Sequence, residues 1–221
     1  MKFGVFLKNF INIRSLWLMY IRKMYLADID KVVKIHLSSF SGFFLSFLGP
    51  RFLTSLYAYF LSSPGGVGYV AVDNSQVVGF VCGSMKPLGF YRRFFLKKWR
   101  EIIFSILLSI IRNPSIAPRL LWRLVTPPQA STEPGTATLM SIAVLPEYQN
   151  KGIGKALIQE FLNEMKKCGM RHVNLTTDRD NNDAVNSFYQ RMGFQLVRSF
   201  VTPEGRWMNE YIIELENLKS K

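Results

Sequence analysis

The chain has 221 residues, of which 48% are hydrophobic and 14% aromatic, and its formal charge is +13. This composition excludes an intrinsically disordered chain and suffices for one domain that buries about 70–75% of its unfolded surface. Only two cysteines (Cys82, Cys168) and two histidines (His36, His172) are present, so no metal-ligand cluster of usual spacing can be assembled and a reduced, cytoplasmic protein is expected.

Residues 1–18 are predicted to form an N-terminal arm before a single domain over residues 19–221. Phenylalanine, leucine and isoleucine recur at helical spacing within the first 11 residues, as in a short amphipathic segment. Lys8 and Arg14 interrupt the apolar residues, so a cleaved signal is not expected. The longest uninterrupted apolar run, residues 16–21, is too short to span a bilayer.

The first part of the predicted domain reads as a strand, two helices and a β-hairpin. Apolar residues at helical spacing predict the helices, and β-formers on both sides of the turn at 73–76 predict the hairpin. The expected ranges are 17–22 for the strand, 26–39 and 51–61 for the helices, and 67–72 and 77–85 for the hairpin strands.

The second part follows a segment of about fifty residues, 86–136, and alternates strands with helices. Gly169 is expected to end the first of these helices, with Lys166 and Lys167 in its last turn, where the helix dipole favours cations. The expected strands are 138–144, 172–176, 194–200 and 208–214, the expected helices are 153–168 and 182–192, and a turn at 203–205 joins the last two strands.

Residues 144–156 are the most informative stretch of the chain. A strand runs into a short polar turn, two glycines follow, and then a helix begins. The first turn of a helix carries unpartnered N–H groups and the positive end of the helix dipole. Gly152 and Gly154 remove side chains that would keep a ligand from these donors, while Lys151 and Lys155 add positive charge. The pattern predicts a diphosphate-binding site built mainly from backbone.

Three other interpretations of this stretch are a P-loop, a dinucleotide fingerprint and an ordinary strand-to-helix turn. A P-loop needs four residues between its glycines, and here one residue separates them. The dinucleotide fingerprint needs a small residue where this chain has Leu157, but Asp178 follows the next strand where a ribose-binding acid would lie, so this alternative stays open.

Two segments carry a resemblance to a known family. Gln149, Gly152, Gly154 and Ala156 resemble the Gln-x-x-Gly-x-Gly-x-Ala pyrophosphate motif of the GNAT superfamily of acetyl-CoA-dependent N-acetyltransferases. Asn182 and residues 188–194 resemble that family's Asn-…-Phe-Tyr-x-x-x-Gly-Phe segment. The resemblance covers 137–200 closely and 19–85 through element order.

The resemblance implies an α/β fold with a mixed, strongly twisted sheet and helices on both faces. Proteins of this fold usually join their third and fourth strands by a short loop, whereas a basic helical insert (86–136) is expected there in this chain. The resemblance implies that the strand before the glycines and the strand after the helix splay apart, with the pantetheine arm of acetyl-CoA between them. It also implies an N-acetyltransferase without a metal, in which a primary amine attacks acetyl-CoA directly in a ternary complex.

The resemblance assigns cofactor contacts to the glycine loop, to the end of the preceding strand and to the helix at 182–192. The backbone N–H near Val144, at an expected bulge, would polarise the thioester carbonyl. Asn182 either caps its helix or bonds the pantetheine arm, and Asn186 is a weaker candidate one turn later. The expected cofactor-binding residues are Val144, Gln149, Asn150, Lys151, Gly152, Ile153, Gly154, Lys155, Ala156, Asn182 and Asn186.

Tyr189 matches the general-acid position of the family, because a phenol with a pKa near 10 is protonated at pH 7 and can donate to a thiolate. The alternative is a plain core aromatic. Many family members carry a glutamate near the positions of Met140 and Ser141, and here neither residue is acidic. Glu210, Asp178 and Glu133 are open alternatives, each expected to be an ordinary solvated acid, and no base is assigned.

The acceptor is left open: an amino sugar or nucleotide sugar is expected first, because it fits the basic insert, and the N-terminus or a side-chain amine of a protein is the alternative. A CoA-binding sensor or membrane adaptor without activity is the non-enzyme alternative. A homodimer is also left open.

The insert is strongly basic, with nine Lys or Arg and one acid over residues 86–123. Its apolar block, 102–111, would form a helix about 15 Å long, too short to span a bilayer. Three interpretations stay open: a helical hairpin packed on the domain or on a second subunit, a peripheral membrane contact through residues 91–125, and an anionic-ligand site. Nucleic acid is disfavoured because the aromatic residues do not interleave with the basic ones.

Overall fold

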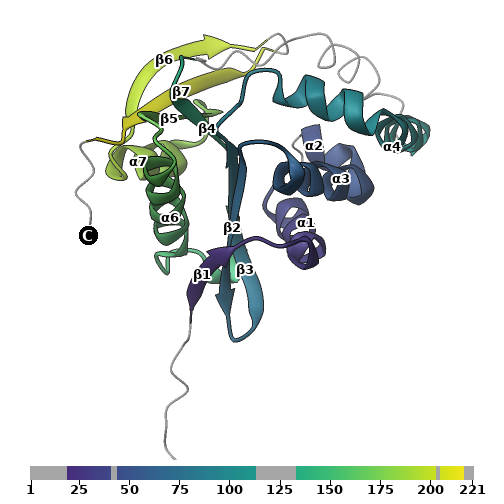
Figure 1. Ribbon diagram of the computed structural model, residues 1–221, viewed down its shortest axis with the longest axis horizontal. Helices are drawn as coiled ribbons and strands as arrows, with labels where there is room; N and C mark the ends of the chain where they lie inside the picture. Colours follow the sequence, from purple (N-terminus) through teal and green to yellow (C-terminus); the bar gives the residue numbers. More distant parts are fainter. Residues whose placement is uncertain (1–18, 41–43, 113–132, 203–204, 217–221) are drawn as a thin grey trace, which may run out of the picture.

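The computed structural model describes residues 19–40, 44–112, 133–202 and 205–216 (Figure 1). Seven strands form one sheet in the order β1-β2-β3-β4-β5-β7-β6. The strands are β1 (Tyr20–Lys23), β2 (Gly66–Asp73), β3 (Gln76–Ser84), β4 (Thr136–Val144), β5 (His172–Asp178), β6 (Gln195–Val201) and β7 (Trp207–Glu214). The β4–β5 pair is parallel, and the other neighbours are antiparallel. The predicted mixed α/β sheet is confirmed.

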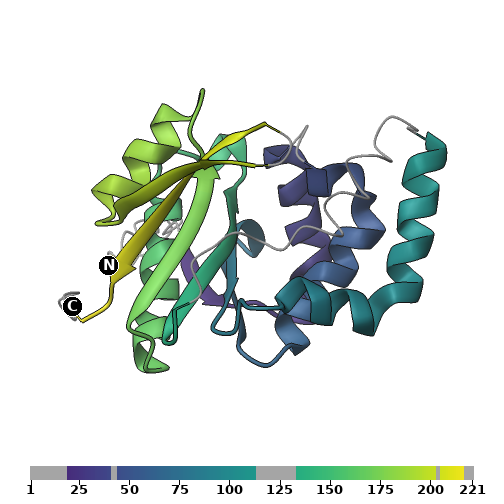
Figure 2. The ribbon, with the colours of Figure 1, turned by 90° about the horizontal axis from the view of Figure 1, so that it is seen from above.

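Helices cover both faces of the sheet, as Figures 1 and 2 show from two directions. On one face lie α6 (Ile153–Lys167) and α7 (Asp183–Arg191), and on the other lie α1 (Ile29–Ser39), α2 (Phe44–Phe47), α3 (Gly49–Ser62) and α4 (Phe90–Arg112). Each face has its own core, with Leu157 and Phe161 buried on the α6 side and Tyr57 and Phe80 buried on the α3 side. The sheet therefore separates two hydrophobic cores.

The element boundaries lie close to those expected from the sequence. The hairpin turns at Asn74 and Ser75, whose φ angles of 46° and 66° suit the tight turn between two twisted strands. The first expected helix is divided into a short 3-10 turn, η1 (Leu26–Asp28), and α1. The short α2 was not predicted, because four residues are too few to show a helical period.

The parallel pair β4–β5 separates after three residue pairs. Thr136, Ala137 and Thr138 lie opposite His172, Val173 and Asn174, whereas β4 continues to Val144 and β5 continues to Asp178. Beyond Asn174, β5 remains paired with β7 and β4 remains paired with β3. The carboxyl-terminal halves of β4 and β5 therefore form the two arms of a V.

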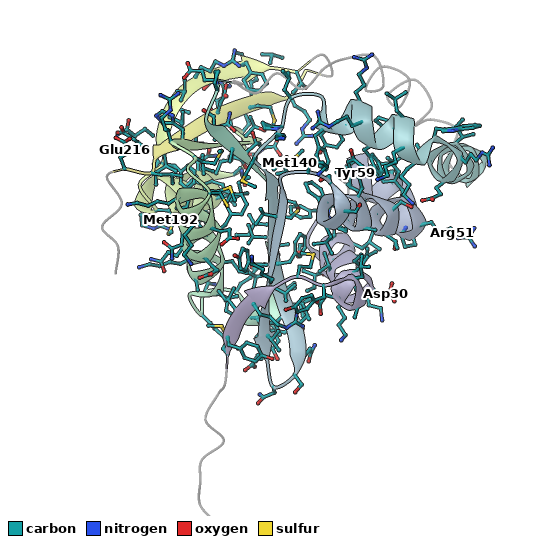
Figure 3. The ribbon with its side chains drawn as sticks, in the orientation of Figure 1. Asp30, Arg51, Tyr59, Met140, Met192 and Glu216 are labelled. Carbon is teal, nitrogen blue, oxygen red and sulfur yellow. The ribbon has the colours of Figure 1, made fainter. Side chains whose placement is uncertain are left out.

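A β-bulge interrupts β4 inside the V. Cys82 lies opposite Ser141 and Gly83 lies opposite Leu139, so Met140 is an extra residue on β4 (labelled in Figure 3). A Cβ atom at Gly83 would lie 2.6 Å from Cζ of Phe161, so only glycine allows this close approach. The expected bulge near Val144 thus lies earlier in the strand, at Met140.

The described part of the insert packs on its own domain. The rings of Phe90 and Phe94 lie 5.2 and 5.3 Å from the ring of Tyr59 on α3, and Ile102 is also buried. The helix kinks at Lys98, where φ is −117° and ψ is 20°. This contact agrees with the packed interpretation for residues 90–102, whereas 113–132 and the predicted arm 1–18 lie outside the described residues.

The outer side of α4 carries exposed apolar residues, namely Leu96, Trp99 and Ile103. Basic residues Arg92, Lys97 and Arg100 are exposed beside them. None of the helices in the described ranges is long and apolar enough to cross a membrane.

Candidate active site

The loop from β4 to α6 ends in an open helix N-terminus. The 3-10 turn η3 (Pro146–Tyr148) leads to Asn150 and Gly152, which have φ angles of 59° and 80°. The first hydrogen bond of α6 runs from the Ala156 N–H to the Gly152 carbonyl, at 3.0 Å. The N–H groups of Ile153, Gly154 and Lys155 therefore have no intrahelical acceptor and point out of the helix end.

The two glycines keep space free beside these donors. A Cβ atom at Gly152 would meet nothing within 4 Å, and one at Gly154 would lie 3.5 Å from Cζ of Phe188. Gly152 is exposed and adopts a left-handed conformation that favours glycine. The observed space, N–H donors and dipole together fit a diphosphate.

Neighbouring residues hold the loop in this conformation. Gln149 donates from Nε2 to the Val144 carbonyl at 3.2 Å, which closes the turn as expected. Ile153 is buried and anchors the first turn of α6 in the core, while Ala156 is half-buried. Lys151 and Lys155 are exposed, and Nζ of Lys151 lies 4.8 Å from the ring centre of Tyr148. The backbone donors are thus fixed in place and flanked by positive charge.

Asn182 and Asn186 join α7 to the end of β5. Asn182 occupies the N-cap position, but its side chain accepts no hydrogen bond from the first turn of α7. Its amide donates to Thr177 Oγ1 and to the Asp178 carbonyl, both at 2.9 Å. Asn186 donates to the Asp178 and Asn182 carbonyls at 2.9 Å and accepts from Asn209 and Tyr211. The amide groups of Asn186 are fully used within the protein, which makes Asn186 a residue that positions α7.

Tyr189 lies on the inner face of α7. Only 6% of its surface is exposed, and its ring packs against Phe188, Phe194 and Tyr211 with centroid distances of 5.5, 5.7 and 6.2 Å. Burial raises the pKa of the Tyr189 phenol, so it stays protonated at neutral pH. Tyr189 is thus a core aromatic with a protonated phenol.

The three acids considered from the sequence differ in their surroundings. Glu210 is 1% exposed and accepts from Nε of Arg198 at 2.7 Å, so the expectation of a solvated acid is wrong for this residue. Asp178 pairs with Arg206, with the shortest N–O distance at 2.6 Å. Glu133 is exposed. Glu210 and Asp178 each form an ion pair with an arginine, which favours a structural role for both carboxylates.

A second polar cluster, not anticipated from the sequence, lies on the other face of the sheet. Nδ1 of His36 on α1 lies 2.7 Å from the hydroxyl of Tyr57 on α3, and that hydroxyl lies 3.4 Å from Oγ of Ser141 on β4. His36 and Tyr57 are buried, whereas Ser141 is half-buried. The only signal in the sequence was the lone His36 on the apolar face of a helix, because the three residues are 21 and 84 positions apart.

The fold brings most of the predicted site residues to the carboxyl-terminal ends of β4 and β5. Val144 ends β4 and Asp178 ends β5, so the glycine loop follows one arm of the V and Asn182 follows the other. Tyr189 extends from α7 into the core on the α6 side of the sheet. Within the described ranges, no group of three or more His, Cys, Asp or Glu is placed to hold a metal ion.

Known proteins match this chain in sequence. The family model of the acetyltransferase (GNAT) family matches residues 30–194. The [ribosomal protein bS18]-alanine N-acetyltransferase of Escherichia coli K12 is 40% identical over 58 residues, which are 26% of this chain and 38% of that protein. The N-alpha-acetyltransferase of Sulfurisphaera tokodaii is 34% identical over 84 residues, 38% of this chain and 50% of that protein. The chain thus matches half or less of the length of these relatives.

Solved structures share the fold over nearly their whole length. The ribosomal-protein-S18-alanine N-acetyltransferase from Escherichia coli has a TM-score of 0.56 and 16% identity, covering 92% of this chain and 100% of that one. The N-acetyltransferase from Staphylococcus aureus Mu50 has a TM-score of 0.59 and 15% identity, covering 89% and 98%. At these identities the likeness concerns the fold, and the family model carries the assignment. The chain belongs to the acetyltransferase (GNAT) family.

Proposed function

We propose that this protein is an N-acetyltransferase that transfers the acetyl group of acetyl-CoA to a primary amine by direct attack. The observation that carries the proposal is the open N-terminus of α6 beside the V between β4 and β5. A helix end with free N–H donors suits a diphosphate, and a strand arm with unpaired backbone suits the extended pantetheine chain.

In the proposed complex, the backbone of residues 150–155 holds the diphosphate. Lys151 and Lys155 contribute favourable charge beside it, and the helix dipole adds about 0.3–1 kcal/mol at an exposed site. Gly152 leaves the approach clear, and Gln149 keeps the turn closed onto Val144. These residues bind and orient, and acetyl-CoA supplies the reactive thioester.

The chemical groups on the protein have distinct tasks. Backbone N–H groups of β4, between the bulge at Met140 and Val144, polarise the carbonyl oxygen. Tyr189 keeps its phenol proton at neutral pH because burial raises its pKa, and it gives that proton to the departing sulfur. The attacking nitrogen loses a proton to water, and water returns one to the Tyr189 phenolate. The hydrogen bonds of Asn186 hold α7 in place, and α7 carries Tyr189.

The acceptor we favour is the α-amino group of a peptide or protein N-terminus. Two relatives are named for this reaction, the bS18-alanine enzyme and the N-alpha-acetyltransferase. A third relative, the mycothiol acetyltransferase of Pseudarthrobacter chlorophenolicus, is 38% identical over 67 residues, 30% of this chain and 20% of that protein. An amino sugar or nucleotide sugar, which suits the charge of the basic insert, is the second acceptor class to test.

Three further predictions concern a membrane contact, the cellular location and the oligomeric state. The exposed apolar and basic side of α4 supports a peripheral contact with an anionic membrane surface, with Trp99 at the interface. The cytoplasmic location and the homodimer stay predictions.

Release of free coenzyme A thiol from acetyl-CoA tests the proposal. The acceptor panel consists of a peptide with N-terminal alanine, free amino acids and glucosamine. Amine-dependent release together with a mass increase of one acetyl group on the acceptor is expected. Tight acetyl-CoA binding without turnover on any amine would instead support the alternative of a CoA-binding sensor, which the absence of an acid on β4 favours.

A further inference from the structure

The polar chain His36–Tyr57–Ser141 lies on the opposite face of β4 from the glycine loop. Tyr57 packs in the core formed by α1, α3 and α4, whereas the loop precedes α6 on the other face. Ser141 lies opposite Cys82, which belongs to the α3-side core, so its side chain faces α3. The chain therefore approaches the V from the side away from the glycine loop.

Ser141 occupies a special position within β4. It follows the bulge residue Met140 and lies three residues beyond Thr138, the last residue of β4 that pairs with β5. Ser141 is half-buried while Tyr57 and His36 are 1% and 4% exposed. The chain thus runs from the protein interior to a hydroxyl on the β4 arm of the V, on the α3 side of the sheet.

The buried end of the chain is built to hold the hydroxyls in place. The Tyr57 ring packs edge-on against Phe80 at 5.3 Å, and His36 packs against Phe40 at 4.8 Å. Nε2 of His36 is buried with no hydrogen-bond partner among the described residues. Burial lowers the pKa of His36 to about 4, so the imidazole is neutral at pH 7 and one ring nitrogen can accept a hydrogen bond.

We propose that Ser141 is the binding residue for the acceptor amine, and that Tyr57 and His36 are positioning residues that fix its hydroxyl. This inference rests on the proposed acetyl transfer. In the proposed arrangement, the Tyr57 hydroxyl donates a hydrogen bond to Nδ1 of His36, and the Ser141 hydroxyl donates a hydrogen bond to the Tyr57 oxygen. The lone pairs of Ser141 then accept an N–H of the amine, which turns the amine lone pair towards the thioester.

The arrangement explains why β4 needs no carboxylate at Met140 or Ser141. A neutral hydroxyl orients an amine that arrives uncharged, and it does so without the cost of a buried charge. The substrate class that fits is a primary amine with at least one N–H free for this bond. Proton loss from the ammonium form would then take place in water before binding.

The test compares Ser141→Ala, Ser141→Thr and Tyr57→Phe with the wild type, using a peptide with N-terminal alanine as the probe. The value of kcat/KM for the peptide should fall about 10- to 100-fold in Ser141→Ala and at least about fivefold in Tyr57→Phe, as for a lost hydrogen bond. Ser141→Thr, which keeps the hydroxyl, should recover most of the activity. The calorimetric Kd for acetyl-CoA should stay within about twofold in all three.

Ser55→Ala is the matched control, because Ser55 lies on α3 but donates to Glu101 of α4 at 2.8 Å. Unchanged kcat/KM in Ser141→Ala would overturn the inference, as would equal losses in Ser141→Ala and Ser141→Thr. A wild type that binds acetyl-CoA but acetylates no peptide would overturn the inference while leaving the cofactor site intact. A wild type that does not bind acetyl-CoA would overturn the proposed function itself.

Discussion

The free energy of unfolding should depend on pH because His36 is buried in the folded protein. The imidazole is 4% exposed, and burial lowers its pKa from 6.5 to about 4. Between these two values the unfolded chain binds a proton that the folded protein does not. The free energy of unfolding should therefore fall as the pH falls from about 6.5 to about 4, and the contribution is fully present above pH 6.5.

The magnitude follows from the size of the pKa shift. Each pKa unit corresponds to about 1.4 kcal/mol, so the shift of His36 corresponds to about 3 kcal/mol over the whole window. From pH 7 to pH 5, the expected loss is about 2 kcal/mol. Asp28, whose pKa is lowered by the Arg22 guanidinium, adds a loss at still lower pH in every variant.

Urea unfolding at several pH values between 5 and 7 measures this effect. His36→Asn removes the titrating ring and keeps an acceptor oxygen near Tyr57, so comparison with the wild type cancels the contribution of the acids. The wild type should lose about 2 kcal/mol more than the variant over this range. Equal losses in the two proteins would refute the burial argument.

Three further predictions follow from the site and the insert. Tyr189→Phe should lower kcat about 100-fold or more with an unchanged Kd for acetyl-CoA, and unchanged turnover would remove the general acid. Asn186→Ala should lower the free energy of unfolding by about 2–4 kcal/mol in urea, because it leaves the Asn209 and Tyr211 donors unpaired; a loss below about 1 kcal/mol would contradict this account. In a flotation assay, the wild type should bind vesicles containing phosphatidylglycerol, and Trp99→Ser should bind them at least about tenfold more weakly. Tyr25→Ser is the control at another exposed aromatic residue. Equal loss of binding in both variants would exclude α4 as the contact.

The cofactor side of the site could be predicted because its signals are local. The positive φ of Gly152 and the free first turn of α6 depend on a dozen consecutive residues, and the element order followed from hydrophobic periods. The resemblance then supplied the V between β4 and β5, which the three-pair ladder confirms.

The proposed acceptor side could not be predicted because it depends on distant residues. His36, Tyr57 and Ser141 meet only after α1 and α3 pack on the sheet. Glu210 reads as a surface acid in the sequence, yet Arg198 lies opposite it on β6, and this partner allows its burial. Such pairings depend on strand register, which the sequence does not reveal.

The insert shows how packing changes the interpretation of a basic segment. Its charges suggested an anionic partner, but three apolar residues, Phe90, Phe94 and Ile102, bury the inner side of α4 against the domain. Helical periodicity identified the helix, whereas the kink at Lys98 appears only in the three-dimensional structure.

The most direct test concerns the backbone donors at the start of α6. Gly152→Leu would place a side chain in the open space beside them, and Gly169→Leu at the other end of the helix is the matched control. Both glycines have a left-handed φ, 80° and 75°, and a Cβ atom at either would meet nothing within 4 Å. The strain of the substitution is therefore similar at the two positions.

Isothermal titration with coenzyme A should show about 10- to 100-fold weaker binding for Gly152→Leu, as expected when charge-assisted hydrogen bonds are lost, and unchanged binding for Gly169→Leu. Equal affinity in the two folded variants would contradict the assignment of the α6 N-terminus as the diphosphate site.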